Sequence, residues 1–158
     1  MSQSLPDNLD FATSLDKIAR TVTANGTSVD TGQDHFARMS QLDLGAWTDG
    51  THKFTWQESP NGTDWTTLTA AQLDDIGGVL DSVDLNSVNV VDATGDDTII
   101  EMGLLVTERF VRVVQTVTGG PATGLVSGVI ITSGLKRYAG GDGQPMSPTG
   151  FQRTQPTI

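Results

Sequence analysis

Two histidines, His35 and His52, are the residues best suited to acid–base chemistry in this chain of 158 residues. His35 follows Asp34, and such a pair can support proton transfer, but the neighbouring residues indicate a loop. His52 lies next to a turn, and we interpret it as a packing residue. No Gly-x-Ser-x-Gly elbow, phosphate-binding loop or His-Glu-x-x-His motif is present. We therefore predict no catalytic residue and no enzymatic activity.

The acidic residues offer two further kinds of chemistry. Segments 81–86 and 92–97 carry the oxygen ligands that calcium prefers, but neither matches the calcium-loop pattern. Glu58, Glu101 and Glu108 can be paired as the carboxylates of a glycosidase, yet any chain with 19 acidic residues offers such pairs. We interpret the acidic segments as solvated loops and predict neither a metal nor a cofactor.

Charge and composition limit the partners. The net charge is −10, from 19 acidic and 9 basic residues, and such a field repels nucleic acid. The absence of cysteine excludes thiol catalysis and cysteine-ligated metals. The first residues lack the basic and apolar regions of a signal peptide, and the longest apolar stretch, 125–131, is interrupted by Ser127 and Gly128. We predict a protein made in the cytoplasm that binds neither nucleic acid nor membrane.

The elements that must position these residues are short strands. Thr and Val recur along the chain, and 18 glycines supply tight turns. The pattern predicts about eight strands, near 17–23, 38–47, 51–58, 64–68, 87–92, 98–106, 109–118 and 125–135. Strands at this spacing are typical of an all-β, jelly-roll-like antiparallel β-sandwich. We expect one such domain over residues 1–138.

The strands on either side of Asp49-Gly50 are predicted to form a hairpin. A three-residue loop ending at Gly50 pairs Leu44 with Phe54 and Leu42 with Trp56, and so gathers the apolar residues on one face. A two-residue loop would mix apolar and polar residues on each face. The three-residue loop requires a left-handed conformation at its glycine.

The following segment is read in the same way. A turn at 59–62 places Leu68 opposite Phe54 and Trp65 opposite Gln57.

One short helix is predicted after this strand. Thr69 and Gln72 have the spacing of a capping box, and Gly77 is a natural stop, so we expect a helix over 70–76.

Trp47 and Trp65 are expected on the outer face of the sheet. Their positions in the predicted register are roughly 20 Å apart, which is too far for one small sugar-binding platform. Exposed aromatic residues also anchor protein interfaces. We predict that both tryptophans contact a protein, and we keep a carbohydrate-binding module as the alternative.

The later strands predict an oligomer. Segments 98–106 and 109–118 are apolar on both faces, which indicates a thick core or a covering neighbour. In a domain of this size we expect a homo-oligomer, most simply a homotrimer.

Residues 139–158 lose the hydrophobic period and are rich in Gly and Pro. Such a segment cannot bury enough apolar surface to order itself, so we predict a flexible C-terminal arm. Met146, Phe151 and Ile158 are spaced along it as apolar contact points. The arm is expected to wrap a neighbouring protein, and its deletion is expected to leave the oligomer itself intact.

Two segments carry a resemblance to a known family. Residues 45–65 read GAWTDGTHKFTWQESPNGTDW, and residues 108–114 read ERFVRVV. Together they resemble small structural proteins of tailed bacteriophages, in which a GxWTDGTHTF…QES.DG..W hairpin precedes a later RYVRV strand. The resemblance covers about half of the chain, from about 42 to 68 and from 104 to 132.

This resemblance implies a head decoration, or cement, protein. Such proteins are jelly-roll-like β-sandwiches, commonly trimeric, that sit on the outside of the capsid and bind the major capsid protein. The resemblance therefore implies a virion protein located on the capsid surface. It leaves open a tail or neck role in the particle.

Overall fold

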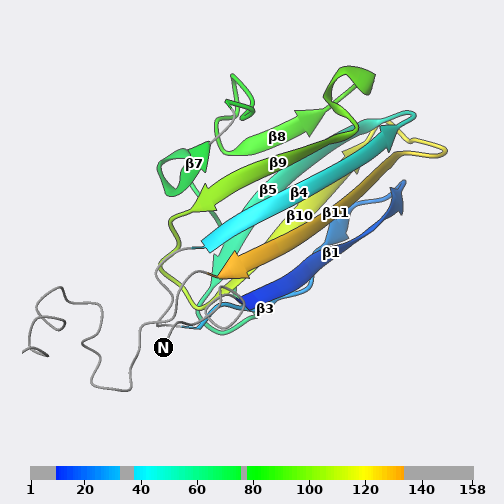
Figure 1. Cartoon of the computed structure of the whole chain (residues 1–158). Helices are drawn as coiled ribbons and strands as arrows, with labels where there is room; N and C mark the ends of the chain where they lie inside the picture. The colour runs from blue at the N-terminus through cyan, green and yellow to red at the C-terminus, as the bar shows by residue number, and fades with distance from the viewer. Residues whose placement is uncertain (1–9, 33–37, 76–77, 134–158) are drawn as a thin grey trace, which may run out of the picture.

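The computed structural model describes residues 10–32, 38–75 and 78–133, and in them two antiparallel sheets pack face to face (Figure 1). Sheet A has the order β1-β11-β4-β9-β7 and comprises β1 (Asp10–Arg20), β4 (Arg38–Trp47), β7 (Leu73–Asp75), β9 (Thr98–Leu104) and β11 (Leu125–Ser133). Sheet B is built around two long paired strands and comprises β2 (Ala24–Asn25), β3 (Val29–Asp30), β5 (Thr51–Ser59), β6 (Thr66–Thr67), β8 (Ser87–Val90) and β10 (Phe110–Thr118). The predicted all-β sandwich is confirmed.

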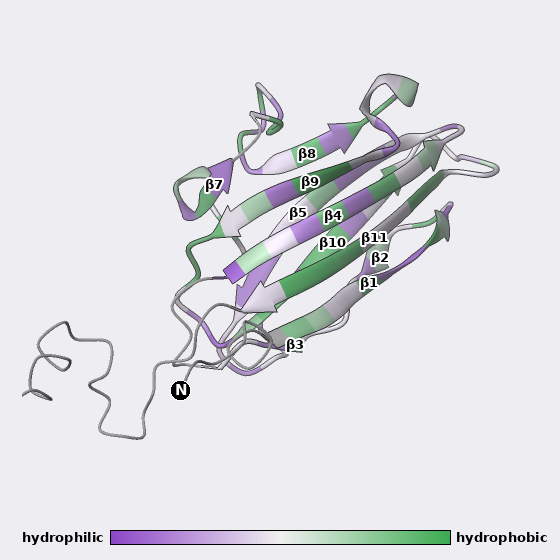
Figure 2. Ribbon diagram, in the orientation of Figure 1, coloured by the Kyte–Doolittle hydropathy of each residue, from purple (hydrophilic) through white to green (hydrophobic). Residues whose placement is uncertain are grey.

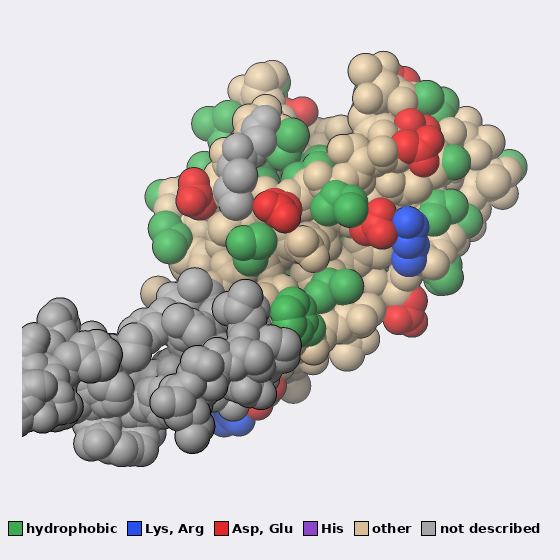
Figure 3. Space-filling model, in the orientation of Figure 1, with side chains coloured by type: hydrophobic (Ala, Val, Ile, Leu, Met, Phe, Trp, Pro, Cys, Tyr) green, Lys and Arg blue, Asp and Glu red, His purple; other side chains and the backbone are tan. Residues whose placement is uncertain are grey.

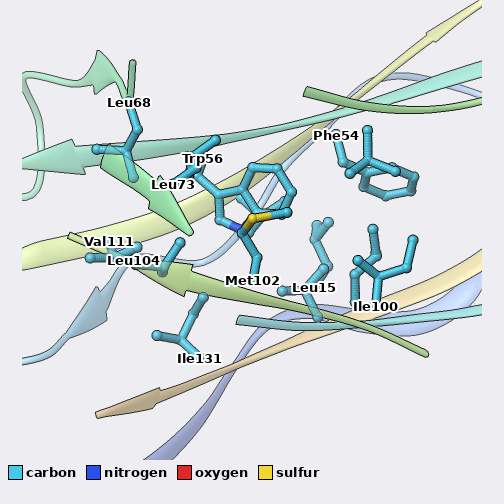
Figure 4. Close-up of a cluster of buried hydrophobic side chains, with 14 of the residues drawn as sticks. Leu15, Phe54, Trp56, Leu68, Leu73, Ile100, Met102, Leu104, Val111 and Ile131 are labelled. Atoms are coloured by element: carbon cyan, nitrogen blue, oxygen red, sulfur yellow. The ribbon is translucent and has the colours of Figure 1, made fainter. Parts of the chain in front are cut away.

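In β4 and β5, the alternation of apolar and polar residues decides which side of the strand faces the core. Leu42 and Leu44 of β4 and Phe54 and Trp56 of β5 are fully or almost fully buried. The residues between them, such as Asp43, lie toward the outside. Figure 4 shows the core that results, with aromatic, leucine, isoleucine and methionine side chains contributed by both sheets.

The predicted hairpin is wrong in its pairing, although its faces are correct. β4 and β5 belong to opposite sheets: Leu42 pairs with Val129 of β11, and Trp56 pairs with Val113 of β10. The chain turns a corner from one sheet to the other, so the two apolar faces meet across the core. Alternation alone cannot distinguish these arrangements, because both bury the same side chains.

The left-handed glycine of the corner is confirmed, with φ of +85° at Gly50. A Cβ atom there would lie 2.8 Å from both Cβ and Cγ of Pro121. We expect Gly50→Val to lower the free energy of unfolding by at least about 1 kcal/mol, because the variant adds backbone strain to this clash. Urea denaturation measures the change, and Gly78→Val, which has a positive φ but open space, isolates the contribution of strain.

The loop between β5 and β6, residues 60–65, is longer than the predicted turn. The Asn61 side chain accepts hydrogen bonds from the N–H groups of Thr63 and Asp64, at 2.9 and 2.8 Å. The longer loop shifts the pairing with β5 by two residues from the predicted register. The Leu68 N–H therefore donates to the Trp56 carbonyl at 2.9 Å, and Leu68 does not lie opposite Phe54. A shift of two residues preserves the faces, and Leu68 is still buried.

The predicted helix over 70–76 is wrong beyond its first turn. The capping box is present, and the Thr69 N–H donates to Gln72 Oε1 at 3.1 Å. The helix is a single 3₁₀ turn, Ala70–Gln72, after which Leu73 is buried and pairs with Leu104 of β9. Strand pairing at the edge of sheet A therefore overrides continuation of the helix. A second 3₁₀ turn, Ala93–Gly95, was not predicted.

Candidate protein-interaction surfaces

His52 lies in the core, where a chain of hydrogen bonds joins the two sheets. Its Nε2 is 3.0 Å from the Asp49 carbonyl, and its Nδ1 is 3.2 Å from Gln115 Nε2. Because a carbonyl only accepts, Nε2 carries the proton and Nδ1 accepts from the Gln115 amide. Gln115 Oε1 in turn accepts from the Ser127 hydroxyl at 2.8 Å. Both ring nitrogens are thus occupied in structural bonds.

Arg20 extends this chain to the edge of sheet A. Its guanidinium donates to the Ser127 carbonyl at 2.8 Å and to the Asp16 carbonyl at 2.6 Å. Burial lowers the pKa of Arg20, and the nearby Asp16 carboxylate partly opposes this effect. These buried polar residues therefore connect strands of the two sheets.

The Asp49 carboxylate holds the loop between β10 and β11 against the β4–β5 corner. It accepts hydrogen bonds from the N–H groups of Ala122, Thr123 and Gly124, at 2.7, 3.1 and 2.5 Å. The bonds from Gly124 and Ala122 are the main cause of a lowered pKa at Asp49.

This lowered pKa predicts a dependence of stability on pH. Asp49 stabilises the fold above its unfolded pKa of about 3.9, and this contribution is lost as the pH falls through the lower folded pKa. Asp49→Asn should therefore reduce stability at neutral pH and flatten the acid limb of the stability curve. Denaturant titrations between pH about 7 and about 2 test this expectation. An unchanged acid limb would contradict it.

The other acidic residues proposed for chemistry also have local partners. Glu58 is buried and accepts from the N–H groups of Thr107 and Glu108, at 2.8 and 3.1 Å. Asp92 accepts from the Thr94 N–H at 2.8 Å. Within residues 10–32, 38–75 and 78–133, no group of three or more His, Cys, Asp or Glu residues is arranged to hold a metal ion. His35 lies outside the described residues.

Trp47 and Trp65 lie in different environments. A bulge in β4 opposite β11 turns Trp47 toward the core, where it is partly buried and its indole N–H bonds to the Gly50 carbonyl at 3.0 Å. The predicted outward position of Trp47 is therefore wrong. Trp65 lies beside sheet B, with the Arg112 guanidinium 4.3 Å from its ring centroid. The two residues belong to opposite layers and form no common platform.

The other predicted contact residues, Met146, Phe151 and Ile158, lie outside the described residues, as does the predicted arm.

The outer face of sheet A carries exposed apolar residues among polar ones. Phe11, Ile99 and Ile130 come from three different strands and are 61%, 61% and 40% exposed. Figure 2 shows the run of hydrophobic residues along β11, and Figure 3 shows hydrophobic side chains lying between acidic ones on this side of the molecule. One ion pair, Lys17–Asp43 at 3.0 Å, interrupts the face. Scattered exposed apolar residues are ordinary, but Ile99 and Ile130 line one hollow on this face, which makes the face a candidate interaction surface.

β9 and β10, the two strands predicted to be apolar on both sides, differ in how far their outward apolar residues are exposed. In β9, Ile99 is exposed on the outer face of sheet A. In β10, the outward residue Val114 is only 9% exposed, so its own chain covers it. The outer face of sheet B is more polar, and there Arg112 Nε donates to Gln57 Oε1 at 2.8 Å.

A groove of about 690 Å³ separates β8 from β9. Its lining includes the apolar residues Val79, Val88, Val90 and Ile100. Figure 3 shows the molecule hollowed between two projecting loops at the top of the view. Sequence reasoning missed this groove, because its walls come from strands of opposite sheets that do not pair.

No protein-family model, curated protein or solved structure matches this chain. Fold and surface together define a two-layer antiparallel β-sandwich with exposed apolar residues on the outer face of sheet A. Among the described residues, no helix is long and apolar enough to cross a membrane.

Proposed function

We propose that this chain is a decoration protein, which binds the outside of a phage capsid and stabilises the contacts between coat subunits. The observation that carries the proposal is the outer face of sheet A, where Phe11, Ile99 and Ile130 are exposed on a two-layer sandwich. The resemblance of residues 45–65 and 108–114 to small phage structural proteins supports it. The buried histidine and its hydrogen-bond partners favour a structural role.

The proposed mechanism is the addition of interface area. The outer face of sheet A packs against further copies of the chain and forms a homotrimer. Loops at the ends of the sandwich then bind several coat subunits at once. Because the decoration protein binds only the assembled shell, its binding energy opposes separation of the coat subunits, and the effect increases with occupancy.

Electron cryomicroscopy of particles assembled with and without the protein tests this function. We expect added density on the outer surface of the shell where coat hexamers or pentamers meet, and slower release of packaged DNA on heating. Density confined to the tail or neck would instead identify a structural module of that region. Absence from all particles would contradict a virion role.

Self-association is tested by introducing negative charges on the outer face of sheet A. We expect Phe11→Glu combined with Ile130→Glu to convert the oligomer to monomers in light scattering, because association would bury two carboxylates. Thr116→Glu, on sheet B, provides the matched control and should leave the oligomer intact. A wild-type monomer at micromolar concentration would contradict the oligomer, and an unchanged oligomer in the double variant would exclude this face.

The carbohydrate-binding alternative rests on Trp47 and Trp65. Their placement in opposite layers removes a shared platform, and Arg112 already covers one face of the Trp65 ring. We therefore expect no binding on a glycan array, and binding that is lost in Trp65→Ala would favour the alternative.

A further inference from the structure

The charges of this chain are unevenly divided. Residues 134–158 contain three of the nine basic residues and one of the 19 acidic residues. Residues 1–133 keep six basic and 18 acidic residues, so the two parts carry net charges of −12 and +2. We call residues 134–158 the C-terminal segment and residues 1–133 the body. Opposite charges of this kind favour contact between the C-terminal segment and the acidic body.

The basic residues of the body are already engaged. Lys17 pairs with Asp43, and Arg109 pairs with Asp30 at 2.6 Å. Arg38 donates to the carbonyls of Gly32 and Val106, at 2.9 and 3.0 Å. The excess acidic charge of the body is therefore not neutralised from within it.

The groove between β8 and β9 presents a strand edge. β7 pairs only with Met102–Leu104, so β9 from Thr98 to Glu101 has β4 as its single strand partner within the described residues. An unpaired edge can take an added strand, whose backbone bonds supply affinity while adjacent pockets accept its side chains. Val79, Val88 and Ile100 supply an apolar lining, and the exposed Glu101 supplies negative charge.

The groove is continuous with the outer face of sheet A. Gln41 and Ile99 line the groove and also a shallow hollow of about 250 Å³ that Gly128 and Ile130 border. A second copy packed on this face would therefore lie next to the groove. A segment of 25 residues, which extends to roughly 80 Å, is long enough to reach it.

We propose that the C-terminal segment of a second copy lies in the groove between β8 and β9 and pairs with the free edge of β9. Its basic residues meet the acidic body, and its apolar residues, among them Phe151, enter the apolar lining. This inference rests on the proposed homo-oligomer, and it adds an exchange of segments between copies.

Disulfide trapping in the full-length protein tests the exchange, because the chain contains no cysteine of its own. One copy carries Thr98→Cys in the groove, and a co-expressed copy carries Gln152→Cys in the C-terminal segment. The matched control pairs Gln152→Cys with Thr27→Cys, an exposed threonine between β2 and β3. Mass spectrometry identifies the joined peptides after mild oxidation.

We expect the 98–152 link between copies to form at least several-fold faster than the 27–152 link. High salt and Glu101→Gln should both slow the 98–152 link, because they weaken the attraction between the segment and the groove. Equal rates at the two sites in an oligomeric protein would overturn the groove assignment while leaving the oligomer intact.

A chain with both Thr98→Cys and Gln152→Cys shows whether the segment in the groove comes from the same chain or from a second copy. A link that forms within single chains, at a rate independent of dilution, would overturn the exchange. Light scattering on the same samples reports the oligomer separately, so a monomer would identify failure of the proposed function itself.

Discussion

Trp56→Ala is expected to lower the free energy of unfolding by about 3–5 kcal/mol, the cost of removing a large side chain from a packed core. Trp56 has no exposed surface and lies between the two sheets (Figure 4). Its loss would leave a cavity that side chains from both sheets cannot fill without moving. Urea midpoints with unchanged slopes would measure the effect.

Trp65→Ala provides the control for residue type. Trp65 is partly exposed and packs against Arg112 on sheet B, so its removal should cost far less. A larger loss for Trp65 than for Trp56 would contradict the assignment of the inner and outer faces of sheet B.

Gln115→Ala is the second substitution with a large expected effect. It removes the donor to His52 Nδ1 and the acceptor for the Ser127 hydroxyl, and both groups remain buried. A buried polar group without a partner costs about 1–3 kcal/mol, so we expect a total loss of at least about 2 kcal/mol. Gln57→Ala, in the outward-facing part of β5, should cost well under that amount.

A double-mutant cycle distinguishes lost hydrogen bonds from lost volume. His52→Leu combined with Gln115→Leu removes both members of one bond and keeps the core filled. We expect the double variant to be more stable than the sum of the single changes predicts. Strict additivity would indicate that His52 and Gln115 are not coupled.

Sequence patterns predicted the faces of the strands well. The alternation through Leu42, Leu44, Phe54 and Trp56 placed each side chain on its correct side. Two local predictions are also confirmed, the left-handed conformation of Gly50 and the capping box formed by Thr69 and Gln72. These features depend on residues close in the chain, and they can therefore be derived from it.

Long-range pairing could not be predicted in the same way. Gly45 is a local signal of the bulge that turns Trp47 inward, but the bulge also depends on how β4 pairs with β11, which residues near Trp47 do not specify. The hydrogen bonds from Gln115 to His52 and from Arg20 to Ser127 join residues 63 and 107 positions apart. The groove depends on where β7 stops pairing with β9. Each of these features follows from which strands meet, and alternation leaves that question open.

The position of β11 has a consequence for synthesis on the ribosome. β11 is the last strand of the described chain, yet it lies in the interior of sheet A and pairs with both β1 and β4. β1 is synthesised before β11, and its pairing partners in β11 follow more than a hundred residues later in the chain. The nascent chain therefore cannot complete this layer until Ser133 has emerged, and in the meantime its apolar strands are exposed to chaperones and to other nascent chains.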